Sequence, residues 1–182
     1  MSKARSAYSI SNKKEKFDTH IIVVWVDNEA GVLARIAGLF SGRGYNIESL
    51  AVAEVDQTKN ISRITIVTTG TPQVIDQIKL QLKKLVPVHK VADFKREDKK
   101  VIFKEMALFK VVSSSAKKEK ALKACKKYNP VILDKTNKSY VIQITALRRE
   151  IDIMSKNLKK FGLVSVSRTG AVAMTRGSDV FK

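Results

Sequence analysis

The sequence predicts an α+β protein made of two tandem ferredoxin-like domains, each with the element order β-α-β-β-α-β. Short β-branched runs alternate with amphipathic segments of helical period along the whole chain. The same order of six elements occurs twice, and a charged stretch, "KREDKK" at 95–100, separates the two copies. A chain of 182 residues is long enough for two small domains with modest cores.

The first half begins with a predicted buried strand, "IIVVWV", and continues into an amphipathic helix after Gly31. Thr71 and Pro72 provide an N-cap and a first-turn proline for a second helix. The predicted elements are a strand at 20–26, a helix at 31–43, strands at 45–55 and 61–68, a helix at 72–85 and a strand at 86–94. The predicted inner faces of the helices carry Val32, Leu33, Ile36, Leu39 and Phe40, and Val74, Ile75, Ile78, Leu82 and Leu85.

The second half repeats this order. We expect a strand at 102–112, a helix at 116–128, strands at 130–135 and 139–145, a helix at 148–161 and a strand at 163–169. The predicted organisation is a flexible basic tail (1–19), a first domain (20–94), a linker (95–101), a second domain (102–176) and a short tail (177–182). Small sheets of this kind commonly leave a face or an edge open, so we expect domains or chains to pair.

Charge, apolar runs and cysteine content limit the classes of function that this chain can have. Lys and Arg number 35 against 17 Asp and Glu, a net charge of +18, which can indicate a nucleic acid, an anionic surface or an acidic protein partner. Most of this excess is scattered lysine, which is more typical of solvated faces. No apolar run approaches the roughly 20 residues of a membrane helix, and the first 20 residues lack a secretory h-region. The single cysteine, Cys125, fits a reducing compartment, and we expect a cytoplasmic protein.

The stretch "VDNEAGVL" joins the first strand to the first helix, and it has two interpretations. The first amides of the helix have no partners within the helix, so they bind either a side-chain cap or a carboxylate ligand. In the first case Asn28 or Glu29 caps the helix, and Gly31 only eases the turn. In the second case Gly31 lets a ligand approach the backbone. Taken alone, this stretch favours the simple capped turn.

A second stretch, "SGRGYNIESL", strengthens the ligand hypothesis. Gly44 is a natural C-cap, and Asn46 lies at the start of the next strand, where asparagine is disfavoured unless it has a hydrogen-bonding role. A zwitterionic ligand needs donors for its carboxylate, an amide or carbonyl for its ammonium, and an apolar pocket. Asn28, Gly31 and Asn46 can provide the polar groups if they come together, either in one chain or across a dimer.

Several long segments resemble the regulatory small subunit of acetolactate synthase, also called acetohydroxyacid synthase, a family of ACT-domain proteins. They are "DNEAGVLARIAGLFSGRGYNIESLAVAEV", "SRITIVTTG", "QIKLQLKKLVPVHKV", "KEMALFKV" and "SRTGAVAMTRG", and together they extend from about His20 to Arg176. "GLFSGRGYNIESL" is specific to this family, whereas "DNEAGVL" alone indicates only an ACT domain. The resemblance implies an N-terminal ACT domain and a C-terminal ACT-like domain without an equivalent ligand motif.

The resemblance also implies a function. It predicts that valine binds at the interface between two small subunits, on Asn28, Gly31 and Asn46, with the Val32 and Leu33 amides completing a carboxylate cradle and Ile47 lining the site. It predicts a homodimer through the ACT domain that binds and activates the large catalytic subunit and confers feedback inhibition in branched-chain amino acid biosynthesis. The small subunit itself would be non-catalytic and would hold no cofactor. FAD, thiamine diphosphate and magnesium would belong to the catalytic subunit, a thiamine-diphosphate-dependent transferase.

Other readings of the residues are weaker. His20 and His89, both expected at strand edges, belong to no metal-binding pattern, and Cys125 is expected to face the core. An RNA-binding protein shares the β-α-β-β-α-β order and the basic charge, but it stacks bases on aromatic residues of its central strands. Here "ISRITIVTT" has none and "SYVIQIT" has only Tyr140, so we expect no nucleic acid and no membrane partner. An amino-acid sensor for another enzyme is the third alternative.

Overall fold

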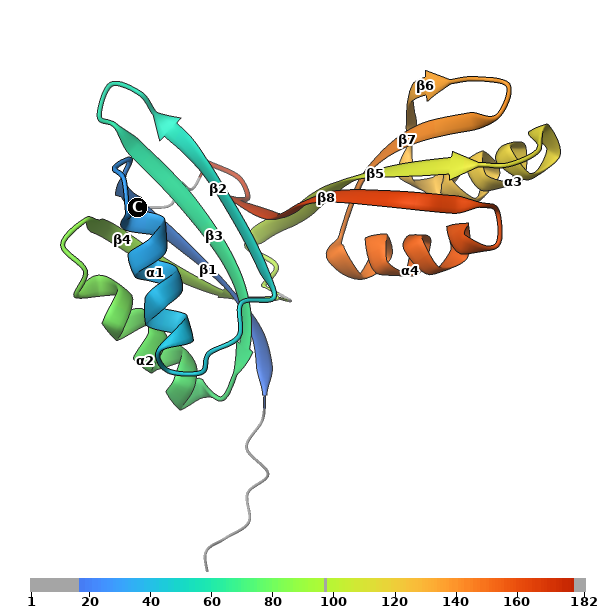
Figure 1. Cartoon of the computed structure of the whole chain (residues 1–182). Coiled ribbons are helices and arrows are strands. Elements are labelled where there is room, and N and C mark those ends of the chain that lie inside the picture. Colours follow the sequence, from blue (N-terminus) through green and yellow to red (C-terminus); the bar gives the residue numbers. More distant parts are fainter. Residues whose placement is uncertain (1–16, 97, 179–182) are drawn as a thin grey trace, which may run out of the picture.

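The computed structural model describes residues 17–96 and 98–178, and it contains two β-α-β-β-α-β units (Figure 1). The first comprises β1 (Asp18–Asp27), α1 (Val32–Ser41), β2 (Ser49–Asp56), β3 (Ile61–Gly70), α2 (Pro72–Lys83) and β4 (Val88–Lys95). The second comprises β5 (Val101–Val112), α3 (Ser115–Cys125), the 3-10 helix η1 (Lys126–Tyr128), β6 (Val131–Lys135), β7 (Ser139–Ala146), α4 (Arg148–Lys159) and β8 (Leu163–Thr175). The predicted fold class is confirmed. Most of the predicted N-terminal tail, residues 1–16, and residues 179–182 lie outside the described residues.

Each unit is a four-stranded antiparallel sheet with two helices packed against it. The strand orders are β2-β3-β1-β4 and β6-β7-β5-β8, so the first and third strands of each unit are central. In the first domain, residues of α1 and α2 pack on the inner face of β1 and β3. In α2, Ile75, Ile78 and Leu82 are fully buried and Val74 is partly buried, as is Leu85 just beyond the end of the helix. The prediction for α1 was wrong at one position, because Leu33 lies on the outer side of the first turn and is 40% exposed.

Most element boundaries lie within two residues of the prediction, and three differ by more. β2 begins at Ser49 rather than at residue 45, because Tyr45 and Ile47 pack against the core before pairing with β3 begins. The helix predicted over 116–128 ends at Cys125 and tightens into η1, and Asn129 follows with a left-handed φ of 48°. β8 does not end at residue 169, since it bends at Gly170 and continues to Thr175.

The longer β8 creates a connection between the domains that the sequence did not predict. Residues 101–105 of β5 pair with residues 171–175 of β8, beyond a β-bulge between Glu105 and Ala107. This two-stranded segment, the junction ribbon, leaves the second sheet and reaches the first domain (Figure 1). Its Val101, Ala171 and Ala173 join Ile21, Val23 and Val67 in a separate apolar cluster. The outer face of the first sheet is therefore partly covered by the second domain.

Polar contacts fix the junction ribbon in place. The Arg63 guanidinium donates to the Ala173 carbonyl at 2.8 Å, and the Ala171 amide donates to Ser49 Oγ at 3.3 Å. At the bend, Arg168 donates to both carboxylate oxygens of buried Glu105 at 2.5 and 2.9 Å. The hydrogen bonds with Glu105 raise the pKa of Arg168 above its usual value, so this guanidinium stays charged.

One lysine of the second domain departs from the solvated pattern expected for this basic chain. Lys118 on α3 is 2% exposed, and its ammonium donates to the carbonyls of Thr136 and Asn137, both at 2.7 Å. It also lies 4.7 Å from the centre of the Tyr140 ring. Lys118 therefore anchors the turn between β6 and β7 to the helix layer.

Replacing this buried ammonium should destabilise the second domain. Lys118→Met keeps the apolar stem but leaves two carbonyls without their donor, which we expect to lower the free energy of unfolding by about 1–3 kcal/mol. Urea denaturation of the full chain measures this loss. Lys120→Met, on the exposed side of the same helix, is the matched control and should change stability by less than about 0.5 kcal/mol. Equal losses in the two variants would contradict the anchoring role.

Cys125 faces the core of the second domain, as predicted, with its Sγ 3.6 Å from Met154 Sδ. Burial raises the pKa of the thiol from 9.0 to about 11, so the folded protein holds almost no thiolate near neutral pH. We expect a disulfide reagent at pH 8 to modify Cys125 at least tenfold more slowly in the folded protein than in urea. Because the folded pKa exceeds the unfolded one, this group's contribution to stability is full below pH 9 and falls between pH 9 and about 11. Equal modification rates with and without urea would contradict this assignment.

Candidate functional site

The turn between β1 and α1 is fixed by the hairpin between β2 and β3. The Asn28 amide donates to the Asn60 carbonyl at 2.7 Å, and Asn60 Nδ2 donates back to the Asn28 carbonyl at 3.3 Å. The Ser62 hydroxyl donates to Asn28 Oδ1 at 3.0 Å. Within the described part of the chain, Asn28 Nδ2 has no acceptor, and the residue is exposed. The amide side chain is thus oriented by its oxygen while its two N–H donors remain available.

Gly31 is the N-cap residue of α1, in a left-handed conformation with φ 86°. A Cβ added at Gly31 would meet nothing within 4 Å, so the space beside this backbone is open. No side chain caps the helix, and the Val32 amide makes only a weak turn contact of 3.4 Å with the Glu29 carbonyl. The expectation that Asn28 or Glu29 caps α1 was wrong. The side-chain oxygen of Asn28 accepts from the Ser62 hydroxyl, and Gly31 occupies the N-cap position. An open, uncapped helix start is suited to an anion.

The second predicted stretch lies at the other end of α1. The carbonyl of Asn46 accepts a hydrogen bond from Thr68 Oγ1 at 2.7 Å, its side chain is exposed, and Ile47 is half-buried against the core. Ser62, next to Asn28, and Thr68, next to Asn46, are six positions apart on β3, which corresponds to about 20 Å along a strand. Within one chain the predicted site residues therefore form two separate groups. One group lies at the start of α1 and contains Asn28, Gly31, Val32 and Leu33. The other lies before β2 and contains Asn46 and Ile47.

Sequence reasoning missed the two hydroxyl residues that fix these groups. Ser62 and Thr68 are 5% and 1% exposed, and each uses its hydroxyl on one half of the candidate site. In the sequence both look like ordinary members of a β-rich run, and only the strand register places them beside Asn28 and Asn46. That register pairs Asp27 with Ile61, one residue before Ser62.

The histidines take part in hydrogen bonds rather than in a metal site. His20 lies near the start of the central strand β1, and its Nδ1 is 2.7 Å from Asp93 Oδ1. His89 lies on edge strand β4, with Nε2 2.5 Å from Asp27 Oδ1. No group of three or more His, Cys, Asp or Glu suited to a metal ion occurs within residues 17–96 and 98–178. None of the helices in these ranges is long and apolar enough to cross a membrane.

Two family models match the chain in succession. Residues 22–90 match the "AHAS small subunit-like ACT domain", and residues 104–177 match the "Small subunit of acetolactate synthase". The two matches follow the two structural units and meet near the junction ribbon.

Individual relatives agree with these matches. The acetolactate synthase small subunit of Aquifex aeolicus is 40% identical over 165 residues, which cover 90% of this chain and 84% of the relative. The one from Mycolicibacterium smegmatis is 33% identical over 159 residues, 87% of this chain and 92% of the relative. The crystal structure of the Thermotoga maritima small subunit superimposes with a TM-score of 0.79 at 32% identity and covers 88% of this chain and 99% of that one. The chain therefore belongs to the acetolactate synthase small-subunit family and carries the ACT domain characteristic of it.

Proposed function

We propose that this chain is a non-catalytic regulatory subunit that binds valine between two ACT domains and transmits feedback inhibition to a catalytic acetolactate synthase subunit. The observation that carries the proposal is the uncapped start of α1 at Gly31, beside an asparagine whose N–H donors are unused within the described residues. The backbone amides of Val32 and Leu33 and the Asn28 Nδ2 would receive the ligand carboxylate. Branched-chain amino acid biosynthesis is the context that the family implies.

Strand register supports a site shared by two chains. Ile61 of β3 pairs with both Asp27 and Asp56, so the end of β2 lies at the level of the Asn28 turn. The start of β2, which follows Asn46 and Ile47, lies at the opposite end of the sheet. Antiparallel pairing of two β2 edges reverses one chain against the other. It would therefore bring Asn46 of one subunit to the sheet end that holds Asn28 of its partner.

The β2 edge has the properties that such pairing needs. It is an edge strand, and its Val52 and Val55 are 45% and 50% exposed. Exposed Leu33 and half-buried Ile47 would provide aliphatic contacts for a branched side chain, and Asn46 would accept from the ligand ammonium. A homodimer through the ACT domain completes a site that each chain holds only in part.

Valine would act through the arrangement of the two ACT domains. A ligand shifts an equilibrium only by its differential affinity, so the states of the dimer must differ at this interface. The second domain and the junction ribbon would transmit the difference to the catalytic subunit. FAD, thiamine diphosphate and magnesium belong to that subunit in this proposal, and valine is the ligand of this chain.

Asn28→Asp is the most conservative test of the site. It keeps an oxygen for Ser62 to donate to but removes both N–H donors and adds a negative charge. We expect the valine concentration for half-inhibition of the reconstituted enzyme to rise about tenfold to a hundredfold, because hydrogen bonds to charged groups are worth about 1.5–3 kcal/mol. Asn157→Asp, an exposed change on α4, is the matched control and should leave inhibition unchanged.

Calorimetry separates this proposal from its main rival. Titration of the full chain with valine, leucine, isoleucine and a short RNA should give saturable heat with valine. Heat with RNA and none with any of the three amino acids would overturn the amino-acid site and favour the RNA-binding interpretation. Unchanged valine inhibition in Asn28→Asp would show that valine binds elsewhere.

A further inference from the structure

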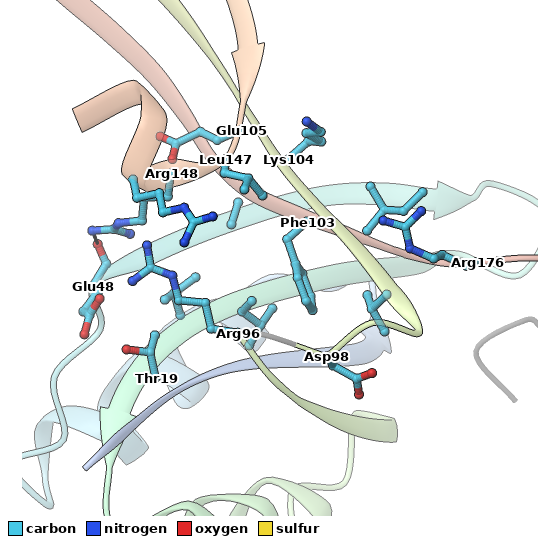
Figure 2. A pocket seen from close by; sticks show the side chains of 16 residues that line it. Thr19, Glu48, Arg96, Asp98, Phe103, Lys104, Glu105, Leu147, Arg148 and Arg176 are labelled. Carbon is cyan, nitrogen blue, oxygen red and sulfur yellow. Dashed lines mark hydrogen bonds between the residues drawn. The ribbon is translucent and has the colours of Figure 1, made fainter. Parts of the chain in front are cut away.

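A cavity of about 430 Å³ lies between the two domains, away from the Asn28 turn (Figure 2). The outer face of the first sheet, the junction ribbon and the start of α4 form its walls. Its apolar floor includes Ile21, Val67, Phe103 and Leu147. The volume is within the range of small-molecule pockets, about 300–1,000 Å³. It is large enough for an ion together with an attached organic group.

The polar lining of this cavity is strongly cationic. Of the residues that the structure describes, five cations line it: Arg96, Lys104, Arg148, Arg149 and Arg176. Figure 2 shows the Arg96 and Arg148 side chains converging beside Glu48, one from the residue directly after β4 and one from the start of α4. Arg148 donates to the Glu48 backbone carbonyl at 3.2 Å. Three of these arginines form no ion pair with a carboxylate among the described residues: Arg96, Arg148 and Arg149.

The carboxylates that line the cavity have other partners. Glu105 is held by Arg168 through two hydrogen bonds. The Glu48 carboxylate accepts from the Thr69 hydroxyl at 2.5 Å, and Asp98 accepts from the Lys100 amide at 2.8 Å. With Glu105 neutralised by its own arginine, five cations remain against two carboxylates among the described residues of the lining. Like charges held together in a partly enclosed space favour binding of an anion.

The backbone adds to this field. Helix α4 begins at Arg148, so the positive end of its dipole lies at the cavity wall beside the arginine side chains. Glu150 caps only the Leu147 amide, at 3.0 Å. Guanidinium groups bind phosphate in a bidentate manner, which makes oxyanions with two or more charges the ligands that fit this lining.

We propose that this cavity is an anion site that takes a small oxyanion of two or more negative charges, either free phosphate or pyrophosphate or the phosphate group of an organic ester. Arg96, directly after β4 of the first domain, and Arg149, in the first turn of α4 in the second domain, both contact the oxyanion, and Arg148 stands beside them. The apolar floor around Phe103 receives the organic part of an ester. Because the arginines that line the cavity come from both sides of the domain junction, the bound anion fixes the position of one domain relative to the other. This site is independent of the valine site.

Equilibrium binding of pyrophosphate, inorganic phosphate and glycerol 3-phosphate to the full chain tests the proposal. The measurement is calorimetric titration at constant ionic strength. We expect saturable binding of at least one probe, weakened about tenfold by Arg96→Gln and by Arg149→Gln. Lys159→Gln removes the same charge from the far end of α4, outside the cavity lining, and should leave the affinity within twofold. Tighter binding of glycerol 3-phosphate than of phosphate would identify an ester as the ligand, and the reverse order a free ion.

General screening of the +18 chain is the competing explanation. It predicts the same loss of probe affinity in all three variants. It also predicts that pyrophosphate and sodium chloride, at equal ionic strength, raise the free energy of unfolding by the same amount. Either result would overturn the proposal, as would the absence of saturable heat with every probe. Asn28→Asp should bind the probes like the unmodified chain, so failure of the valine site and failure of the anion site are distinguishable.

Discussion

Gly31→Asp should abolish valine inhibition of the reconstituted enzyme and leave activation of the catalytic subunit largely intact. The substitution places a carboxylate where the proposed ligand carboxylate lies, beside the uncapped start of α1. Like charges in direct opposition cost several kcal/mol, so we expect the half-inhibitory valine concentration to rise about a hundredfold or more. The open space beside Gly31 accommodates the new side chain without a clash.

Gly31→Asn is the matched control for this effect. Asparagine has the size of aspartate and, like it, tolerates the left-handed φ of 86° at this position better than other non-glycine residues. The two variants therefore share backbone strain and bulk, and they differ in charge. Inhibition should be weakened at least tenfold more in the aspartate variant, as measured by valine titrations of each reconstituted enzyme. Equal weakening would show that no ligand carboxylate lies beside this residue.

Gly170→Ala should produce the largest loss of stability at the domain junction. Gly170 has φ 82°, which costs an alanine about 1–2 kcal/mol. Its added Cβ would lie 2.7 Å from Ser49 Oγ and 3.2 Å from the Leu50 carbonyl oxygen. Strain and overlap together should lower the free energy of unfolding by about 2–4 kcal/mol and displace the junction ribbon from the first sheet. Urea denaturation and hydrogen exchange at residues 171–175 measure the two effects.

Gly44→Ala separates the overlap from the strain. Gly44 also has a left-handed φ, of 67°, but a Cβ there would meet nothing within 4 Å. Its variant should lose only about 1 kcal/mol and leave exchange in the ribbon unchanged. Adding Ser49→Ala to Gly170→Ala removes one clashing atom and should restore part of the stability. Equal losses for the two glycines would mean that the ribbon moves freely on the first sheet.

Local signals were sufficient for most of the fold. The apolar period of α2 placed Ile75, Ile78 and Leu82 on the inner face, and Thr71 caps this helix by accepting from the Val74 amide, as its position before Pro72 predicts. The candidate site was predictable in composition but not in arrangement. Asn28 and Gly31 are neighbours in sequence and remain neighbours in space, whereas Asn46 lies at the far end of the same helix.

The two β-α-β-β-α-β repeats and the polar turn before α1 follow from local signals in the sequence, because helical and strand periods and turn residues act over only a few positions. Other features depend on contacts between segments that are distant in the sequence, and they form only when the chain folds. Residues 101–105 pair with residues 171–175. The Lys118 ammonium donates to the carbonyls of residues 136 and 137. The Arg96 side chain lies beside that of Arg148 at the domain junction. No local period encodes such contacts, since each depends on which apolar faces meet once both sheets have formed.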